Sequence, residues 1–357
     1  MADEDSSSGD ITSSAVREMI RYLKSSWSVK KIDRSVHGTD FVAIVDVHTS
    51  DERRQVVFKA ATADWTAPET VQAEPRLMSL VDQETTIPVP TVYGYCDEHD
   101  QYPAPFYVMS YVDGENYEGR TQCLAPHVRD QILREAGHNL AELHELGPLS
   151  KIGRIGVQNG NVTVLDTDDH PSSEDFHDWL LASYEETLDS LTDGGYFPEL
   201  ADEPTRFADL VPGLRQYLRD VIPELPDPDP PTYCHQDYRY GNVLIDPKTG
   251  QTQAVLDWGV IMAVAPAFNI ASAESLLLTP DSDSVARTEA LRRTFRTAYT
   301  GIRDSWSFDA ATLERMHVYQ LTCRLDAMAC LPLWYQDTPV ERDGRAAEHR
   351  DFVAQYL

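Results

Sequence analysis

The spacing of apolar residues divides the chain into two parts of different character. Near its start, apolar residues recur every three or four positions and predict an amphipathic helix over residues 12–25. Short apolar runs bounded by polar turns follow, and such runs are typical of strands. The predicted strands cover residues 40–47, 55–60, 91–96 and 105–112, with a hairpin loop at 48–54 and a helix at 69–81. The first part of the chain is therefore predicted to be rich in β-structure.

The second part of the chain has mainly helical spacing. Residues 126–147 carry a stripe of leucine and isoleucine, and a short β-like segment lies at 231–257. Further helical patterns cover residues 174–193, 207–222, 284–302 and 310–331.

A β-rich part followed by a larger helical part predicts an α+β fold with two lobes. The predicted divisions are a disordered tail at residues 1–10, a β-rich N-terminal lobe at 11–112 and a helical C-terminal lobe at 113–357. A ligand is expected in the cleft between the lobes.

The balance of charge is strongly acidic. The chain has 30 basic and 59 acidic residues, which gives a formal net charge of −29. Such a surface repels the phosphates of nucleic acids and anionic membranes, so neither is expected as a partner. Lysine is scarce among the basic residues, and the acidity is spread along the whole chain. This pattern favours adaptation to high salt; the alternative is an acidic surface that attracts a cationic substrate.

Neither a membrane span nor a disulfide framework is predicted. No apolar run approaches the roughly 18–20 residues that a membrane helix needs. The first ten residues are acidic and polar, unlike the basic and apolar regions of a signal peptide. The five cysteines include no C-x-x-C pair, which argues against a cysteine zinc site. We therefore expect a cytoplasmic protein with free thiols.

One segment of the second part carries a pattern suited to phosphoryl transfer. His235, Asp237 and Asn242 form the pattern H-x-D-x-x-x-x-N, and Asp257 follows later, at the end of an apolar strand. Phosphoryl transfer from ATP needs a carboxylate that accepts the proton of the substrate hydroxyl, and oxygen ligands that hold magnesium against the phosphates. An Asn side chain and an Asp carboxylate supply the hard oxygen donors that magnesium prefers. The alternative is a purely structural hairpin, since an isolated H-x-D-x-x-x-x-N match is weak.

Residues 233–246 and 254–259 together resemble the signature of the aminoglycoside phosphotransferase-like kinases, a family that includes choline and homoserine kinase relatives. The resemblance implies a bilobal protein-kinase-like fold and the use of ATP and Mg²⁺. It makes Asp237 the catalytic base, Asn242 and Asp257 the metal ligands, and His235 a residue that shapes the loop.

Features of the first part resemble the nucleotide-binding elements of the same family. Kinases hold the α- and β-phosphates with a strand Lys paired to a helix Glu, and Lys59 and Glu74 are spaced for such a pair. Pro75 would fit the first turn of a helix, which gives the helix at 69–81 an alternative start near Glu74. The run 106–114 resembles the hinge strand beside the adenine. The resemblance implies that Met109 lines the nucleotide pocket. It also implies that the main chain of Ser110 and Val112 bonds the edge of the adenine.

The phosphate-covering loop of the family has a weak counterpart in this chain. Gly38 is the single glycine of the run Val36-His-Gly-Thr-Asp-Phe41, which lacks the pattern G-x-G-x-x-G. The resemblance assigns Gly38 to the nucleotide, and the alternative is an ordinary turn glycine.

The chain departs from the family pattern after the D-W pair. Relatives usually carry a G-D-P-x-x-D-L-A run there, whereas this chain has Ala263-Val-Ala-Pro-Ala-Phe-Asn-Ile-Ala271. Asn269 therefore stands where a carboxylate is usual, and Ala265 where an aspartate is usual. The resemblance implies that relatives brace the catalytic loop with that second carboxylate, which this chain lacks. Upstream, His144 ends a segment that resembles the L-a-x-L-H helix of the family; its simplest interpretation is a packing or capping histidine.

The leading hypothesis is an enzyme that transfers the γ-phosphate of ATP to a hydroxyl of a small molecule, of the aminoglycoside, sugar or amino-alcohol class. A protein kinase is disfavoured, because Trp258 replaces the Phe of D-F-G and no A-P-E-like segment follows. The remaining alternative is a nucleotide-binding pseudokinase with a regulatory role, although a binder has no need of a base such as Asp237. Asp326 is a candidate for holding an amine of the acceptor, as acidic groups of the helical lobe do in relatives. The acceptor itself, the oligomeric state and the choice between ATP and GTP are not predicted.

Overall fold

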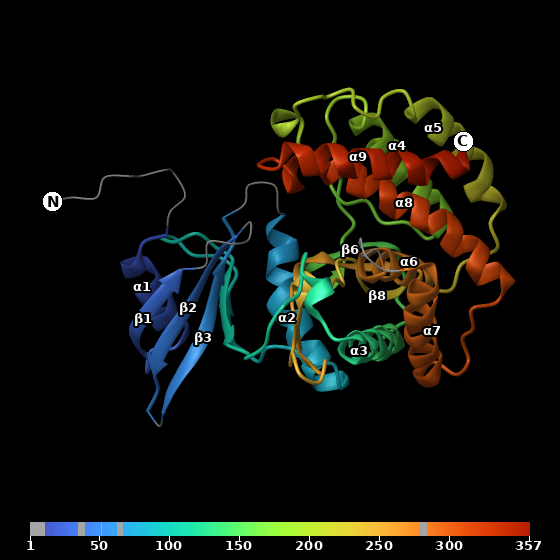
Figure 1. The fold of residues 1–357 in the computed structure, drawn as a ribbon. Helices are drawn as coiled ribbons and strands as arrows, with labels where there is room; N and C mark the ends of the chain where they lie inside the picture. Colours follow the sequence, from blue (N-terminus) through green and yellow to red (C-terminus); the bar gives the residue numbers. More distant parts are fainter. Residues whose placement is uncertain (1–10, 35–39, 51, 63–66, 279–283) are drawn as a thin grey trace.

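The computed structural model describes residues 11–34, 40–50, 52–62, 67–278 and 284–357. The predicted disordered tail at 1–10 and Gly38 lie outside these residues. Within them, a five-stranded sheet forms one lobe and a larger, mainly helical lobe packs beside it (Figure 1). The predicted α+β, bilobal fold is confirmed. The boundary at residue 112 stays a prediction.

The sheet of the first lobe is antiparallel throughout, with the strand order β1-β2-β3-β5-β4. Its strands are β1 (Ser28–Arg34), β2 (Phe41–His48), β3 (Arg53–Ala60), β4 (Val92–Cys96) and β5 (Phe106–Ser110). Buried and half-buried residues alternate along β2, because successive side chains point to opposite faces of a sheet. The buried face packs against α1 (Ser13–Leu23), whose Val16, Met19 and Ile20 are fully buried.

Helix α2 (Pro68–Glu84) lies between the sheet and the helical lobe (Figure 1). It begins at Pro68, a first-turn position where a proline costs no hydrogen bond. The alternative start near Glu74 is wrong, because Pro75 lies inside the helix. The apolar side of α2 belongs to the hydrophobic core of the helical lobe, and not to the core of the sheet lobe. The residues of α2 in that core are Ala73, Leu77, Met78 and Val81.

The helical lobe contains two small groups of strands beside its helices. The helices are α3 (Pro126–Glu145), α4 (Phe176–Ser190), α5 (Val211–Val221), α6 (Pro266–Leu277), α7 (Val285–Ile302), α8 (Ala310–Trp334) and α9 (Pro339–Val353). The strands are β6 (Gly153–Gln158), β7 (Asn161–Val164), β8 (Thr232–His235), β9 (Val243–Ile245), β10 (Thr252–Val255) and β11 (Ile261–Val264). Four of them form a sheet of order β7-β6-β11-β8, and β9 and β10 form a hairpin.

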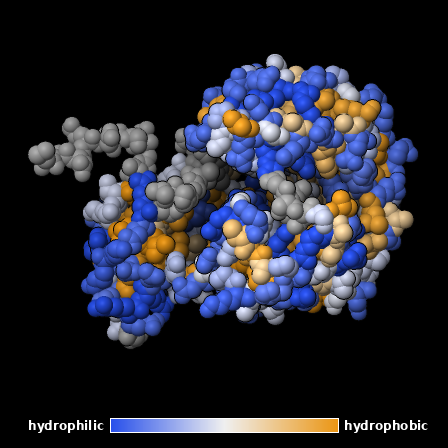
Figure 2. Space-filling model, viewed as in Figure 1, coloured by the Kyte–Doolittle hydropathy of each residue, from blue (hydrophilic) through white to orange (hydrophobic). Residues whose placement is uncertain are grey.

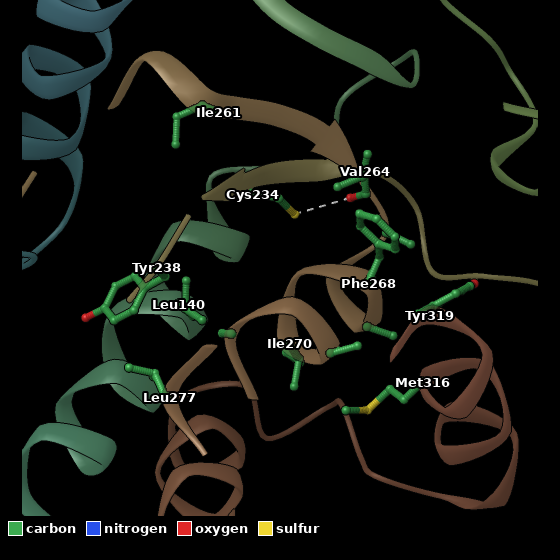
Figure 3. Close-up of a cluster of buried hydrophobic side chains, with 14 of the residues drawn as sticks. Leu140, Cys234, Tyr238, Ile261, Val264, Phe268, Ile270, Leu277, Met316 and Tyr319 are labelled. Carbon is green, nitrogen blue, oxygen red and sulfur yellow. Dashed lines mark hydrogen bonds between the residues drawn. The ribbon is translucent and has the colours of Figure 1, made fainter. Parts of the chain in front are cut away.

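The core of the helical lobe lies directly under β8 and β11. Figure 3 shows Leu140 of α3, Cys234 of β8, Phe268 of α6 and Tyr319 of α8 in one buried cluster, with the Cys234 thiol donating to the Val264 carbonyl oxygen at 3.4 Å. Helices from three distant parts of the sequence, α3, α6 and α8, thus support the strand that leads into the H-x-D-x-x-x-x-N segment.

Several elements of the fold are not predicted by the sequence pattern, namely β1, β6, β7, β11, α6 and α9. Helix α6 shows the physical reason most clearly. Ten of its twelve residues are buried. A helix that is buried on nearly all sides has no polar face, so the 3.6-residue periodicity that marks an amphipathic helix is absent.

The surface is polar, as the charge composition predicts. On the face in Figure 2, hydrophilic residues predominate and hydrophobic residues gather in small groups. Surface ion pairs join arginine to carboxylates, for example Arg350 to Asp209 at 2.7 Å and Arg287 to Asp130 at 2.9 Å. Among the described residues, no helix combines the length and apolar character that a membrane span requires.

The excess of carboxylates leads to a prediction about salt. In dilute buffer the unscreened carboxylates repel one another, and molar salt shortens the screening length to about 3 Å. We expect the midpoint of thermal unfolding to rise between about 0.1 M and about 3 M potassium chloride. Circular dichroism in both salts measures this directly. Equal midpoints would contradict adaptation to high salt and would favour the alternative, an acidic surface that attracts a cationic substrate.

Candidate active site

The predicted catalytic loop, residues 235–242, connects β8 to β9. β11 runs antiparallel to β8 with Ile261 opposite His235, and the Leu256 N–H donates to the Asn242 carbonyl oxygen at 2.8 Å. The loop is therefore held from both sides by the chain that follows the β9–β10 hairpin. Asp257 comes immediately after Leu256, so the same backbone contact brings it to the loop.

His235 holds the loop through both nitrogens of its ring. Its Nε2 donates to the Leu256 carbonyl oxygen at 2.9 Å, and its Nδ1 accepts from the Asp237 N–H at 3.3 Å. A neutral imidazole protonated on Nε2 satisfies both bonds. Burial lowers the pKa of His235 and so favours this neutral form. The ring also packs edge-on against Trp258 and Tyr238, which agrees with a structural role.

Asp237 and Asn242 are in direct contact. The Asn242 Nδ2 donates to Asp237 Oδ2 at 2.7 Å and to the Asp237 carbonyl oxygen at 2.9 Å. The Asp237 side chain remains 31 % exposed, so a substrate can reach it. Because the amide nitrogen of Asn242 is used within the loop, its amide oxygen is the atom left for a ligand. That oxygen accepts no hydrogen bond from the described residues.

Asp257 has an unusual backbone conformation. Its φ of 63° and ψ of 61° lie in the left-handed region, which residues other than glycine seldom adopt. Backbone strain of this kind is concentrated at functional sites. The Asp257 side chain is 41 % exposed, and its Oδ1 lies 3.9 Å from Lys59 Nζ. Its carboxylate accepts no hydrogen bond within the described part of the chain.

The oxygens of Asn242 and Asp257 fit a magnesium ion. Both are hard donors, and neither is occupied by another protein group in the described ranges. Magnesium usually takes one or two protein carboxylates and completes its shell with water and substrate phosphates. The described residues include no group of three or more His, Cys, Asp and Glu that could enclose a metal ion.

Lys59 lies at the centre of a group of carboxylates. Its Nζ is 2.8 Å from Glu74 Oε2 and 3.7 Å from Asp40 Oδ2. Burial opposes the charge on Lys59, but the carboxylates of Glu74 and Asp257 outweigh it and hold the Lys59 pKa well above its ordinary value. The structure therefore brings together the Lys–Glu pair that the sequence predicts. The pair joins β3 of the sheet lobe to α2.

The predicted hinge lies at the end of β5. Met109 is half-buried against the core of the helical lobe. The Ser110 N–H donates to the Thr91 carbonyl oxygen at 2.8 Å, so this hydrogen is not available to an adenine. The main chain of Val112 makes no backbone hydrogen bond in the described part of the chain. Val112 therefore remains the better candidate donor of the two.

Asn269 braces the loop where relatives are expected to use a carboxylate. It is fully buried on α6, and its Nδ2 donates to the His235 carbonyl oxygen at 2.6 Å. Its Oδ1 accepts from His144 Nε2 at 2.9 Å, and His144 Nδ1 accepts from the Tyr299 hydroxyl at 2.7 Å. Arg303 completes the chain by donating to the Tyr299 oxygen at 2.8 Å. The sequence leaves the effect of the lost carboxylate open, and the structure shows that the Asn269 amide contacts the loop in its place.

His144 is accordingly more than a packing residue. Burial lowers its pKa to about 3, so the ring stays neutral and keeps one donor and one acceptor. A carbonyl oxygen such as that of His235 can only accept, which fixes the orientation of the Asn269 amide and then the tautomer of His144. Ala265 precedes α6, is buried, and adds no polar group.

Replacing Asn269 by leucine is expected to lower the free energy of unfolding. The change leaves the His235 carbonyl oxygen and the His144 N–H buried without partners, at about 1–3 kcal/mol for each group. Urea unfolding measures the loss. Asn161→Leu on the exposed β6–β7 turn is the control and should change stability by less than about 0.5 kcal/mol. A loss for Asn269→Leu as small as that of the control would contradict the brace.

Two sets of contacts in the site carry no sequence signal: the contact of Arg239 with Asp237, and the tyrosine partners of Asp326. Arg239 Nε lies 2.9 Å from Asp237 Oδ1 and 3.0 Å from Oδ2. Asp326, a sequence candidate, accepts hydrogen bonds at 2.8 Å from the hydroxyls of Tyr184 and Tyr196. Both tyrosines are more than 100 residues away in sequence, so no local pattern links them to Asp326.

Asp326 lies on α8, where its two hydrogen-bond partners are tyrosine hydroxyls. Burial raises the pKa of Asp326 to about 6. Burial, Asp326 and Asp237 together raise the pKa of Cys330, one turn further along α8, to about 12. In addition, Ser272 donates to the carbonyl oxygen of Gln236, next to Asp237, at 3.1 Å.

Comparisons with known proteins agree with the bilobal fold. Solved structures with the same fold include a thermostable mutant of aminoglycoside phosphotransferase APH(4)-Ia in complex with ADP and hygromycin B (TM-score 0.60, 14 % identity, 96 % of this chain and 98 % of that chain covered). Others are APH(2")-IIIa with GDP and kanamycin (TM-score 0.60, 14 % identity, 94 % and 97 % covered) and the ethanolamine kinase of Plasmodium vivax (TM-score 0.55, 11 % identity, 96 % and 89 % covered).

A curated relative and a family model cover much of the same region. The chain is 23 % identical over 243 residues to acyl-CoA dehydrogenase family member 10 of Mus musculus; the match covers 66 % of this chain and spans 19 % of the length of that relative. The model of the phosphotransferase enzyme family (APH) matches residues 43–308, which include Lys59, Glu74, the loop 235–242 and Asp257. The chain therefore belongs to the APH phosphotransferase enzyme family.

Proposed function

We propose that this protein transfers the γ-phosphate of ATP to a hydroxyl group of a small molecule. The observation that supports this most directly is the position of Lys59. It contacts Glu74 on α2 and lies 3.9 Å from Asp257, which follows the loop that carries Asp237. The lysine proposed to bind the phosphates thus lies close to the carboxylate proposed to hold the metal, although the two residues come from different lobes. A purely structural hairpin would not need this convergence.

Each residue has a separate role in this proposal. Lys59, held by Glu74, binds the α- and β-phosphates, while the oxygens of Asn242 and Asp257 hold Mg²⁺. Magnesium would neutralise charge on the phosphates. Asp237 accepts the proton of the acceptor hydroxyl as that oxygen attacks the γ-phosphorus. Met109 and the main chain near Val112 border the adenine. His235 and Asn269 position the loop and do not touch the reactants.

Binding of nucleotide provides the first test. Titration calorimetry with ATP and magnesium should show binding by the wild type that depends on magnesium. Lys59→Ala should weaken it by roughly 10-fold or more, since a charge-assisted phosphate contact is worth about 1.5–3 kcal/mol. Lys151→Ala is a matched control, because Lys151 pairs with Asp166 on the surface of the helical lobe. No nucleotide binding by the wild type would contradict the proposal.

A screen of hydroxyl acceptors provides the second test. Aminoglycosides, sugars and amino alcohols are offered with ATP and magnesium, and ADP release is measured above the background without acceptor. Turnover of any acceptor supports an enzyme. Nucleotide binding without turnover of any acceptor would favour the pseudokinase alternative.

Asp326 supports an acceptor that carries an amine. Its carboxylate is partly buried, yet both partners are neutral tyrosine hydroxyls, so its charge is not compensated by a cation among them. A cationic amine would supply that charge. The alternative interpretation is a structural carboxylate that only orders Tyr184 and Tyr196.

The pKa of Asp326 predicts how the binding of an amine-bearing acceptor changes with pH. With a pKa of about 6, the carboxylate is charged at neutral pH and becomes neutral as the pH falls through 6. We expect the KM of an amine-bearing acceptor to rise as pH falls through this range, and Asp326→Asn to raise it at pH 7.5. The KM of an uncharged sugar is the control and should change in neither case. Equal effects on both acceptors would contradict the amine site.

A further inference from the structure

Arg239 occupies the carboxylate that the proposed reaction needs as a base. Its Nε lies 2.9 Å from Asp237 Oδ1 and 3.0 Å from Oδ2, while Asn242 takes a second position on Oδ2. Asp237 thus has a cation across both of its oxygens. A guanidinium held this way lies directly beside the position where the acceptor hydroxyl and the phosphoryl group are proposed to meet.

Arg239 is held in this position by a second carboxylate. Its Nη1 lies 3.2 Å from Oε1 of Glu118, in the segment that connects the hinge to α3. Glu118 is more than half exposed, so this contact is weak enough to exchange. Arg239 itself is 34 % exposed on the side of the site that the solvent reaches.

The backbone next to Asn242 is shaped around this guanidinium. A Cβ on residue 241 would lie 2.6 Å from Arg239 Nη1 and 3.2 Å from Glu118 Oε2, so Gly241 leaves room for the guanidinium in its observed position, and a larger residue would shift it. This glycine does not have a positive φ. Its lack of a side chain therefore serves the close approach of Arg239, and not an unusual turn.

The Arg239 guanidinium also has N–H groups that make no hydrogen bond with the described residues. Nε serves Asp237 and Nη1 serves Glu118, while Nη2 makes no hydrogen bond with the described residues. A planar guanidinium with free N–H groups matches the oxygens of a phosphoryl group, and arginine is used in this way to stabilise phosphoryl-transfer transition states.

We propose that Arg239 is a catalytic residue that moves from Asp237 to the transferring phosphoryl group. This proposal rests on the proposed function. In the reaction, the acceptor hydroxyl oxygen forms a bond to the γ-phosphorus, and the bond from that phosphorus to the β-γ bridging oxygen breaks, its electron pair leaving on ADP. The hydroxyl proton goes to Asp237. Arg239 donates to the equatorial oxygens of the phosphoryl group.

A phosphoryl mimic tests this without any acceptor. Fluoroaluminate bound together with ADP and magnesium imitates the transferring group, so calorimetry is carried out with MgADP alone and with MgADP plus fluoroaluminate. The wild type should bind MgADP more tightly when fluoroaluminate is present. Arg239→Ala should lose roughly 100-fold or more of that gain, in line with the 10³–10⁵ that such an arginine contributes to rate, and keep its affinity for MgADP alone.

Three further variants sharpen the result. Arg239→Lys keeps the charge without the planar fork and should retain only part of the gain. Gly241→Ala keeps Arg239 but fills the space beside its guanidinium. The variant should therefore lower the gain in MgADP affinity only in part. Arg120→Ala is the matched control, because Arg120 lies nearby, stacked on Tyr117 and away from Asp237. Guanidinium ions added to Arg239→Ala should restore part of the gain.

The outcomes separate this proposal from the proposed function. If the wild type binds no MgADP, the proposed function fails. If the wild type shows the gain and Arg239→Ala keeps all of it, Arg239 does not contact the phosphoryl group and this inference is overturned. A melting temperature of Arg239→Ala close to that of the wild type excludes misfolding as the cause of a lost gain, and Arg239→Lys gives the same comparison if the alanine variant is unstable.

Discussion

Replacing Asp237 by asparagine is expected to lower the rate of phosphate transfer by roughly 10²–10⁴-fold, the usual contribution of a positioned general base. Asparagine has the same shape and still fits beside Asn242, but its amide cannot accept the proton of the acceptor hydroxyl. Binding of ATP and magnesium should survive, because the nucleotide is held by Lys59, Asn242 and Asp257. The rate is measured at saturating ATP and magnesium with an accepted acceptor, and the affinity by calorimetry.

The combination of lost rate and retained affinity is what distinguishes a base from a structural residue. Asp246→Asn is a suitable control, since Asp246 caps the turn of the neighbouring hairpin by accepting from the Lys248 and Thr249 N–H groups. It should leave the rate close to that of the wild type. If Asp237→Asn transfers phosphate as fast as the wild type, the H-x-D-x-x-x-x-N match is not the catalytic loop, and the pseudokinase alternative gains support.

Asp257→Asn is expected to impair binding as well as rate. It removes the charged ligand of the proposed magnesium pair, and magnesium in turn holds the phosphates. We expect the magnesium concentration needed for half-maximal activity to rise at least about 10-fold, the lower end of the losses seen when a metal site is weakened. Titration of activity and of nucleotide binding with magnesium measures both effects.

The pattern across the two variants is the sharper test. Asp237→Asn should leave the magnesium dependence unchanged, whereas Asp257→Asn should shift it. Asparagine also tolerates the left-handed backbone of residue 257 better than most residues, so the fold should remain intact. An unaltered magnesium dependence in Asp257→Asn would show that Asp257 is not a metal ligand.

The local patterns of the sequence predict much of the fold, because they record which face of an element is buried. The alternation along β2 and the apolar stripe of α1 both lie where they are predicted. The Lys59–Glu74 pair can also be anticipated, since a strand lysine and a helix glutamate at this spacing match a known phosphate-binding pair. These features depend on residues close in sequence or on a family motif.

Features that depend on distant residues could not be predicted in the same way. The brace consists of Asn269, His144 and Tyr299, and these three residues belong to three separate helices. From the sequence, Asn269 marks only the loss of a carboxylate; the structure shows that an amide serves because its partner is a carbonyl oxygen. Arg239 presents a similar case, because its contact with Asp237 depends on the space that Gly241 leaves open.

The left-handed conformation of Asp257 has a consequence for the evolution of this chain. A residue with a Cβ pays about 1 kcal/mol or more to hold that conformation, whereas glycine adopts it freely. Glycine at 257 would thus make the folded protein more stable and would remove the carboxylate from the site. Selection for stability alone would therefore favour glycine at 257, whereas the proposed binding of magnesium requires the carboxylate. Laboratory evolution towards heat resistance, without a requirement for activity, should find this substitution early.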